Sequence, residues 1–263
     1  MAFDGITIAC MAHELQEKLT GGRISKIAQP EADELLLTVK SREGNFRLLL
    51  SASAGLPLVY LTGANKPGPM TAPNFCMLLR KHISGGRILS VTQPSLERIL
   101  RFEIEHLDEL GDLCRKRLIV ELMGKHSNII FCKEDGVILD SIKHVSSQMS
   151  SVREVLPGRD YFIPLTEHKG DPSTVSLEGF ADLMAAAPAP VRKALYMKLT
   201  GISPIMGEEL CHLASIDGDR SANQLSQHEL THLHRTLTLM MEDVRLGDFS
   251  PNIIYRRGAP VEF

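Results

Sequence analysis

The stretch LTGGRISKIAQPE at residues 19–31 decides the fold, because it returns as ISGGRILSVTQPS at residues 83–95. Gly-Gly-Arg-Ile and Gln-Pro hold the same places in both copies. A repeat of this kind indicates one structural unit that is present twice. The Gly-Gly pair predicts the end of a helix in each copy, since glycine adopts the left-handed conformation that closes a last turn.

Apolar periodicity predicts what surrounds each copy. Helices are expected at about 4–19, with Asp4 as N-cap, and at about 72–83, with Pro73 in the first turn. Alternating patterns then predict antiparallel strands at 35–40, 46–50, 58–62, 99–104, 118–123, 129–132 and 137–142. The expected fold class is α+β, a helix plus antiparallel strands, present in duplicate.

The pattern changes after Pro157 and Gly158. We expect the duplicated α/β-sandwich domain over 1–165, a linker over 166–174 and an all-helical domain over 175–248. Its helices are predicted at 177–186, 190–199, 204–213 and 225–246. A basic, strand-like return segment follows at 249–263, and because it ends without a polar tail we expect the chain to be the front part of a longer protein.

The composition indicates a globular protein. Against 29 Lys and Arg stand 32 Asp and Glu, and 43% of the 263 residues are hydrophobic, which argues against disordered and collagen-like classes. No apolar run approaches the ~20 residues of a membrane span, and no secretory signal is visible. Five isolated cysteines suggest buried thiols in a reducing compartment. We therefore expect a cytoplasmic protein without a membrane partner.

LTGISPIMG at residues 199–207 has the spacing of a helix-hairpin-helix, centred within about 195–215. Gly201 permits the tight turn, and backbone N–H groups near Ser203 at the start of the next helix can meet a phosphate. Such hairpins bind nucleic-acid backbone without reading sequence. The alternative is an αα-corner that merely packs two helices.

HELTH at residues 228–232 matches the zincin pattern formally. The apolar face of that helix leaves His228 and His232 on the outer side, and no third ligand is evident, so no metal is expected. No P-loop, dinucleotide or serine-esterase motif is present, and nothing marks a catalytic pair. We expect neither enzymatic activity nor a cofactor.

Basic side chains lie near predicted helix and strand ends, where they could hold phosphate and ribose. The alternative for each is an ordinary solvated surface. The main candidates are Arg80, Lys81, Arg98, Lys125 and His126.

Several motifs together resemble the NFACT family, whose members include ribosome quality-control factors of the RqcH type and proteins called fibronectin-binding protein A (PavA-like). The motifs are FDGI at 3–6, the two GGRI-x-x-x-x-QP copies, PNFCMLLRKH at 73–82, ERI at 97–99, ELMGKHSNII at 121–130 and LPG at 156–158.

The resemblance implies an RNA-binding module that binds the 50S ribosomal subunit carrying a stalled nascent chain and recruits alanyl-tRNA for C-terminal alanine tailing. In the family, an Asp near the N-terminus and an Asp-Arg pair are tied to tRNA engagement, which carries over to Asp4, Glu97 and Arg98. Glu97 departs from the family's Asp and has a longer arm. The family's coiled coil and NFACT-R domain are absent from this sequence.

The family resemblance also implies a first domain similar to the N-terminal part of formamidopyrimidine-DNA glycosylases. Those enzymes attack with an N-terminal proline amine, whereas this chain begins Met-Ala-Phe-Asp, so we expect the chemistry to be lost. Two alternatives stay open: a glycosylase-like nucleic-acid-binding domain, and a surface adhesin with fibronectin as partner.

Overall fold

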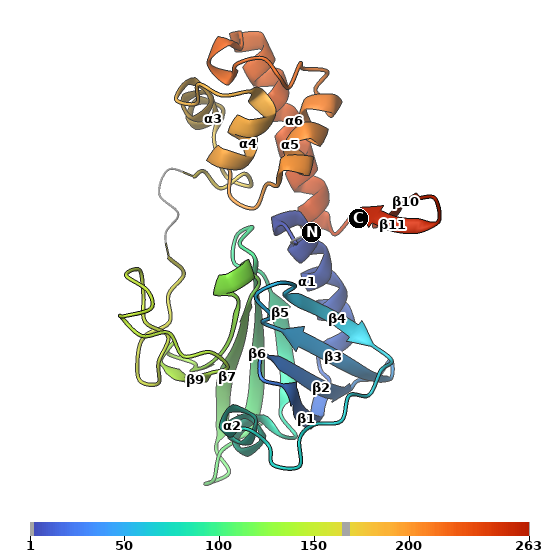
Figure 1. Cartoon of the computed structure of the whole chain (residues 1–263), viewed down its shortest axis with the longest axis vertical. Coiled ribbons are helices and arrows are strands. Elements are labelled where there is room, and N and C mark those ends of the chain that lie inside the picture. The colour runs from blue at the N-terminus through green and yellow to red at the C-terminus, as the bar shows by residue number, and fades with distance from the viewer. Residues whose placement is uncertain (1–2, 165–168, 263) are drawn as a thin grey trace.

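The computed structural model describes residues 3–164 and 169–262, which form a sheet unit, a helical unit and a terminal hairpin (Figure 1). The sheet has the strand order β4-β3-β2-β1-β5-β6-β7-β8-β9, all antiparallel. Its elements are α1 (Gly5–Leu19), β1 (Arg23–Glu31), β2 (Glu34–Lys40), β3 (Asn45–Ser51), β4 (Leu58–Thr62), α2 (Asn74–Ile83), β5 (Arg87–Thr92), β6 (Ile99–Leu107), β7 (Leu113–Glu121), the short helix η1 (Gly124–His126), β8 (Asn128–Lys133) and β9 (Ile138–Ser141).

The two sequence copies meet at the middle of this sheet. Gly21 N–H donates to the carbonyl of Ile88 at 2.8 Å, and Gly85 N–H donates to that of Ile24 at 2.7 Å. Ile24 and Ile88 likewise donate to the carbonyls of Gly86 and Gly22, each at 2.9 Å. Every bond therefore has a counterpart with the copies exchanged, and the duplicated α+β unit expected from the repeat is confirmed.

Strands β1 and β5 had no counterpart among the predicted strands. Each contains a register irregularity, between Ile24 and Lys26 in β1 and between Ile88 and Ser90 in β5. A bulge inserts one extra residue, so the next buried side chain comes three positions later, at Ile27 and Val91, rather than two or four. The period of two that marks a strand is lost at this point.

Helix α1 belongs to two cores at once. Asp4 caps it by accepting from Thr7 N–H at 2.8 Å, as expected. Ile8 and Leu15 are buried against the sheet, while Ile6 and Ala9 pack into the core of the helical unit. This helix therefore connects the two units: it starts at the junction between them and runs along the sheet unit (Figure 1).

The helical unit contains α3 (Leu177–Ala185), α4 (Val191–Lys198), α5 (Pro204–Leu213), the short η2 (Ala222–Gln224) and α6 (Gln227–Leu246). The segment expected as a linker lies partly outside the described residues, and its second part is fixed to this unit. Gly170 N–H donates to Lys198 O at 2.8 Å, and Thr200 N–H donates to Gly170 O at 2.9 Å.

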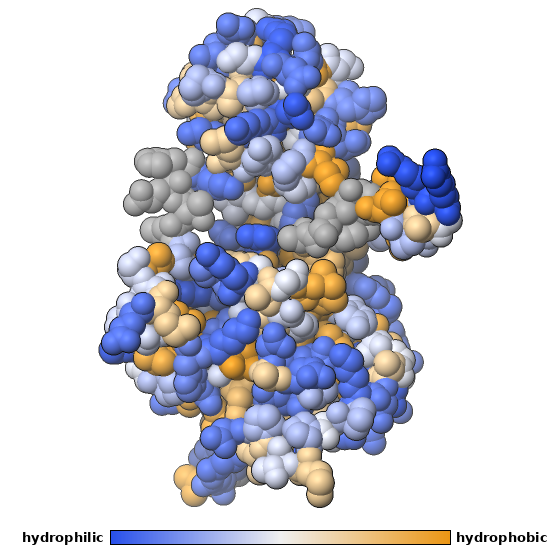
Figure 2. Space-filling model, in the orientation of Figure 1, coloured by the Kyte–Doolittle hydropathy of each residue, from blue (hydrophilic) through white to orange (hydrophobic). Residues whose placement is uncertain are grey.

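The terminal residues form a hairpin, β10 (Ile254–Arg256) and β11 (Ala259–Glu262), that projects to the side near the junction of the two units (Figure 1). Its apolar residues Ile253, Ile254 and Tyr255 are more than half exposed. Figure 2 shows hydrophobic residues near the base of this hairpin and near the junction of the two units, on a largely hydrophilic face.

Two general expectations can be compared with the structure. Cys76, Cys132 and Cys211 are buried, but Cys10 and Cys114 are only half-buried, so burial of all five thiols was wrong. Among the described residues, no helix has the length and apolar character needed to cross a membrane.

Candidate nucleic-acid interface

A hollow of about 500 Å³ opens where the sheet unit meets the helical unit. Its walls come from the start of α1, the residue before β6, the segment before α3 and the turn between α4 and α5. The lining residues are Phe3, Asp4, Gly5, Thr7, Arg98, Lys169, Tyr196, Gly201, Ile202, Ser203, Pro204, Ile205 and Met206.

Backbone contact between two glycines closes the floor of the hollow. Gly5 N–H donates to Gly201 O at 2.8 Å. A Cβ on either glycine would lie 2.4 Å from the carbonyl oxygen of Leu96. Gly201 has a φ of +74°, as the tight hairpin turn requires. The turn between α4 and α5 therefore packs against the sheet unit and also lines the hollow.

The N-termini of α1 and α5 both border this hollow. Asp4 caps α1 and also accepts from the Thr7 hydroxyl at 2.9 Å. Ser203 caps α5, accepting from Met206 N–H at 3.3 Å, with Pro204 in the first turn. A helix N-terminus carries a partial positive charge that favours an anionic ligand. At α1 the Asp4 carboxylate already answers this charge, so the start of α5 is the helix end that favours an anion in this hollow.

Two cationic side chains add to this field. Arg98 and Lys169 line the hollow, and the Lys169 ammonium donates to Tyr196 O at 3.0 Å. Burial lowers the pKa of Lys169, the Arg98 charge acts in the same direction, and Glu97 opposes both. Burial raises the pKa of the neighbouring Glu97 carboxyl, against the charges of Arg98 and Lys169.

The structure brings together four of the predicted site residues, Asp4, Arg98, Gly201 and Ser203. Glu97 is adjacent: its backbone carbonyl accepts from the Gln93 amide, which also donates to Gly5 O, both at 2.8 Å. The Gln93 side chain, which lies in the second copy of the repeat, thus fixes the turn that presents Arg98.

The remaining predicted residues lie elsewhere. Arg80 and Lys81 are on α2, at the end of the sheet unit away from the helical unit (Figure 1). Arg80 donates through Nε to Ile27 O at 2.9 Å, and Lys81 pairs with Glu109 at 2.9 Å. Lys125 and His126 belong to η1 and line a second hollow.

Sequence reasoning missed Lys169 and Tyr196. Lys169 falls in the segment expected as a linker, and Tyr196 is one residue of an amphipathic helix. Only the tertiary contact between Lys169 and the end of α4 brings both to Arg98, so no local signal could have indicated them.

The HELTH segment lies in the first turns of α6, where Glu229 has a structural role. His228 and His232 are exposed, as expected. Glu229 forms a capping box with Ser226 and an ion pair with Arg220, with 2.5 Å between Oε1 and Nη1. Its carboxylate is therefore engaged at the start of α6.

Comparison with known proteins agrees with these motifs. The family model described as NFACT N-terminal and middle domains matches residues 4–263. The chain belongs to the NFACT family. The family resemblance seen in the sequence is thereby confirmed.

NFACT relatives span bacteria to animals. The chain is 37% identical over 254 residues to the protein named Rqc2 homolog RqcH from Bacillus subtilis, covering 96% of this chain and 43% of that relative. It is 24% identical over 186 residues to the human ribosome quality control complex subunit NEMF, covering 71% of this chain and 16% of that relative. The chain thus spans less than half the length of either relative.

Solved NFACT structures share the fold. The N-terminal part of the fibronectin/fibrinogen-binding protein from Streptococcus suis aligns with a TM-score of 0.75 and 36% identity, covering 90% of this chain and 84% of that one. The fibrinogen-binding protein from Staphylococcus aureus aligns with a TM-score of 0.75 and 30% identity, covering 94% and 84%. The α+β class with a following helical part is confirmed.

Proposed function

We propose that this chain is a non-enzymatic RNA-binding module of a ribosome quality-control factor, and that the hollow at the unit junction engages tRNA. The observation that carries the proposal is the convergence of Arg98, Lys169 and the N-terminus of α5 on one hollow. These groups come from three separate segments, and all of them favour a phosphate-bearing ligand.

The chemistry of the hollow favours binding over bond cleavage. Its described lining contains one carboxylate, Asp4, which is occupied by Thr7 N–H and the Thr7 hydroxyl. It offers no thiol or imidazole among the described residues, and its one described amine, the Lys169 ammonium, donates to Tyr196 O. The apolar side chains beside the cations suit unpaired nucleotides, whose bases stack on such surfaces.

We extend the proposal to the whole factor because three of its relatives are named ribosome quality control complex subunits. In this proposal the factor acts in the cytoplasm, binds the large ribosomal subunit with its stalled nascent chain, and recruits tRNA-Ala for alanine tailing. The hollow would hold the tRNA while other parts of the factor contact the ribosome.

The test is to sequence the RNA that copurifies with the chain from its host, and to measure tRNA affinity by filter binding. We expect enrichment of tRNA over a mock purification and saturable binding of purified tRNA. Absence of both would contradict the proposal. Immobilised fibronectin provides a parallel assay, in which capture of the chain without tRNA binding would favour the adhesin alternative.

A further inference from the structure

A second hollow, of about 180 Å³, lies at the end of β7 and the start of β8. The segment that follows β9 forms its outer wall. Basic and imidazole side chains dominate its polar lining, namely Lys125, His126, Lys143, His144 and Arg153.

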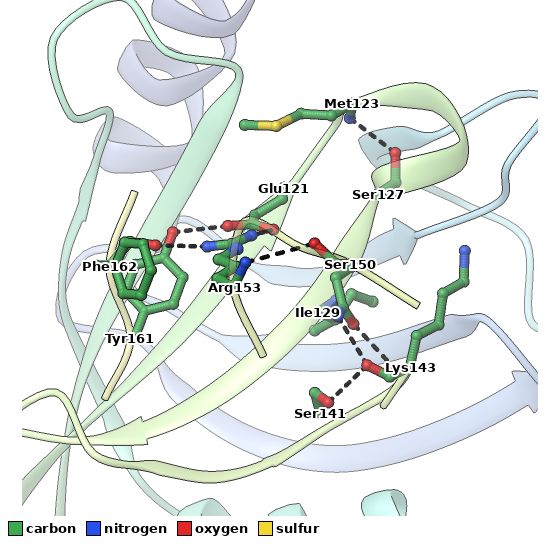
Figure 3. A network of polar contacts seen from close by, with 11 residues as sticks. Glu121, Met123, Ser127, Ile129, Ser141, Lys143, Ser150, Arg153, Tyr161 and Phe162 are labelled. Carbon is green, nitrogen blue, oxygen red and sulfur yellow. Dashed lines mark hydrogen bonds and ion pairs between the residues drawn. The ribbon is translucent and has the colours of Figure 1, made fainter. Parts of the chain in front are cut away.

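Buried polar residues hold this lining in place. Asn128, which is 2% exposed, accepts from Lys143 N–H at 3.1 Å and donates to Lys143 O at 2.8 Å. Ser141 donates to the same carbonyl at 2.8 Å. Ser127 accepts from Met123 N–H at 2.8 Å and so closes the turn that carries Lys125 (Figure 3). The side chains are therefore presented from a preformed frame.

Glu121 is the one carboxylate among the described lining residues, and it is already neutralised. Glu121 is fully buried, forms an ion pair with Arg153, and accepts from the Tyr161 hydroxyl at 2.9 Å (Figure 3). Lys125 and Lys143 form no ion pair with any residue in the described ranges. The Lys143 ammonium donates to Ala52 O, which uses one of its three protons. The hollow therefore keeps an excess of positive charge.

The second hollow is close to the first. Leu122, which follows β7, donates its N–H to Arg98 O at 2.8 Å. Arg98 lines the first hollow, and Glu121, one residue before Leu122, lines the second. One nucleic-acid strand that enters the first hollow can thus continue across η1 to the second.

We propose that this second hollow is an anion site that binds a phosphate group of the RNA backbone through Lys125 and Lys143. The proposal extends the proposed function, since the phosphate would belong to the same RNA. Inorganic phosphate shares the chemistry and serves as the small probe.

The first arm of the test titrates inorganic phosphate into ¹⁵N-labelled chain and follows backbone amide shifts by NMR. We expect saturable shifts at residues 124–128 and 143–145, and their loss in the Lys125→Gln/Lys143→Gln variant. Lys133→Gln, an exposed lysine at the other end of β8, should keep them. Thermal unfolding shows whether each variant is folded. If the double variant is unfolded, the single variant Lys125→Gln, which removes only an exposed charge, takes its place in the titration.

The second arm measures tRNA affinity against salt concentration. The double variant should reduce the magnitude of the slope of log K against log salt by about 0.7, since one phosphate contact is lost and each contributes about 0.7 for single strands. Lys133→Gln should leave the slope unchanged.

The outcomes separate the two proposals. If phosphate shifts nothing in this hollow, or the double variant leaves the salt slope unchanged while Arg98→Ala weakens tRNA binding, the anion site is overturned and the proposed function stands. If phosphate shifts the hollow but tRNA does not bind, the hollow binds free phosphate only: RNA as the ligand is overturned together with the proposed function.

Discussion

Gly5 and Gly201 are joined by a backbone hydrogen bond of 2.8 Å, and each lies so close to Leu96 that neither position has room for a side chain. The sheet unit and the helical unit meet at this point, and Gly5 and Gly201 also line the proposed tRNA hollow. Small residues here set the distance between the two units.

Gly201→Ala should therefore destabilise the chain strongly. The new Cβ would lie 2.4 Å from Leu96 O, and the φ of +74° adds strain for any residue with a side chain. Gly158→Ala is the matched control, because Gly158 has a φ of +83° and nothing within 4 Å of its Cβ. That control should lose only about 1 to 2 kcal/mol for its conformation. Equal losses for the two variants in urea unfolding would show that the close contact does not matter.

Arg98→Ala should weaken tRNA binding by about 1 to 3 kcal/mol, the usual contribution of a charged hydrogen bond. Because Arg98 lines an open hollow, thermal stability should stay nearly unchanged. Filter binding provides the affinity, with Arg42→Ala, an exposed arginine in the loop between β2 and β3, as control. A folded Arg98→Ala variant with the affinity of the unaltered chain would remove Arg98 from the site.

Arg153→Met should cost about 3 to 5 kcal/mol of unfolding free energy, since it leaves the Glu121 carboxylate buried without its cation. Combining it with Glu121→Gln should recover a large part of that loss. The double-mutant cycle in urea measures the coupling. Additive losses would mean that the ion pair contributes no interaction of its own.

Glu229 predicts a pH dependence at the start of α6. The Arg220 side chain and the Ser226 backbone and hydroxyl lower its pKa from 4.5 to about 2. A lowered pKa in the folded state stabilises the fold above the unfolded pKa, and this contribution is lost as pH falls through about 2. The difference in Tm between the chain and Glu229→Gln should thus be constant above about pH 5 and shrink below it. Glu178→Gln, in the first turn of α3, controls for loss of one carboxylate. A difference that does not change between pH 5 and 2 would contradict this assignment.

The sequence predicts the elements that have a regular pattern. The helices at the start of the chain and at Pro204–Leu213 lie within a residue of their expected bounds, because a cap and an apolar stripe mark each. Strand β7 starts five residues earlier than expected, because its first residues extend along an exposed hairpin and lack buried side chains. Strands β1 and β5 are not predicted, because a bulge in each interrupts the alternation of buried and exposed side chains that marks a strand.

The site could be predicted only in part. Asp4 and Arg98 are expected from the family resemblance, and Gly201 and Ser203 from the spacing of the hairpin motif. Lys169 becomes part of the site only through the docking of its segment on the end of α4, and this docking depends on packing that no local pattern encodes.

The paired GGRI copies have a consequence for the symmetry of the sheet. The two copies donate and accept backbone hydrogen bonds at equivalent positions where β1 meets β5. A chain with a single copy would therefore present a strand edge that can pair with the same edge of a second, identical chain. The centre of the sheet therefore has the two-fold arrangement that a homodimer of single-copy chains would have. Within one chain either copy can change without its twin, and the helical unit packs against both, on Ile6 and Ala9 of α1 and on Leu96 after the second copy.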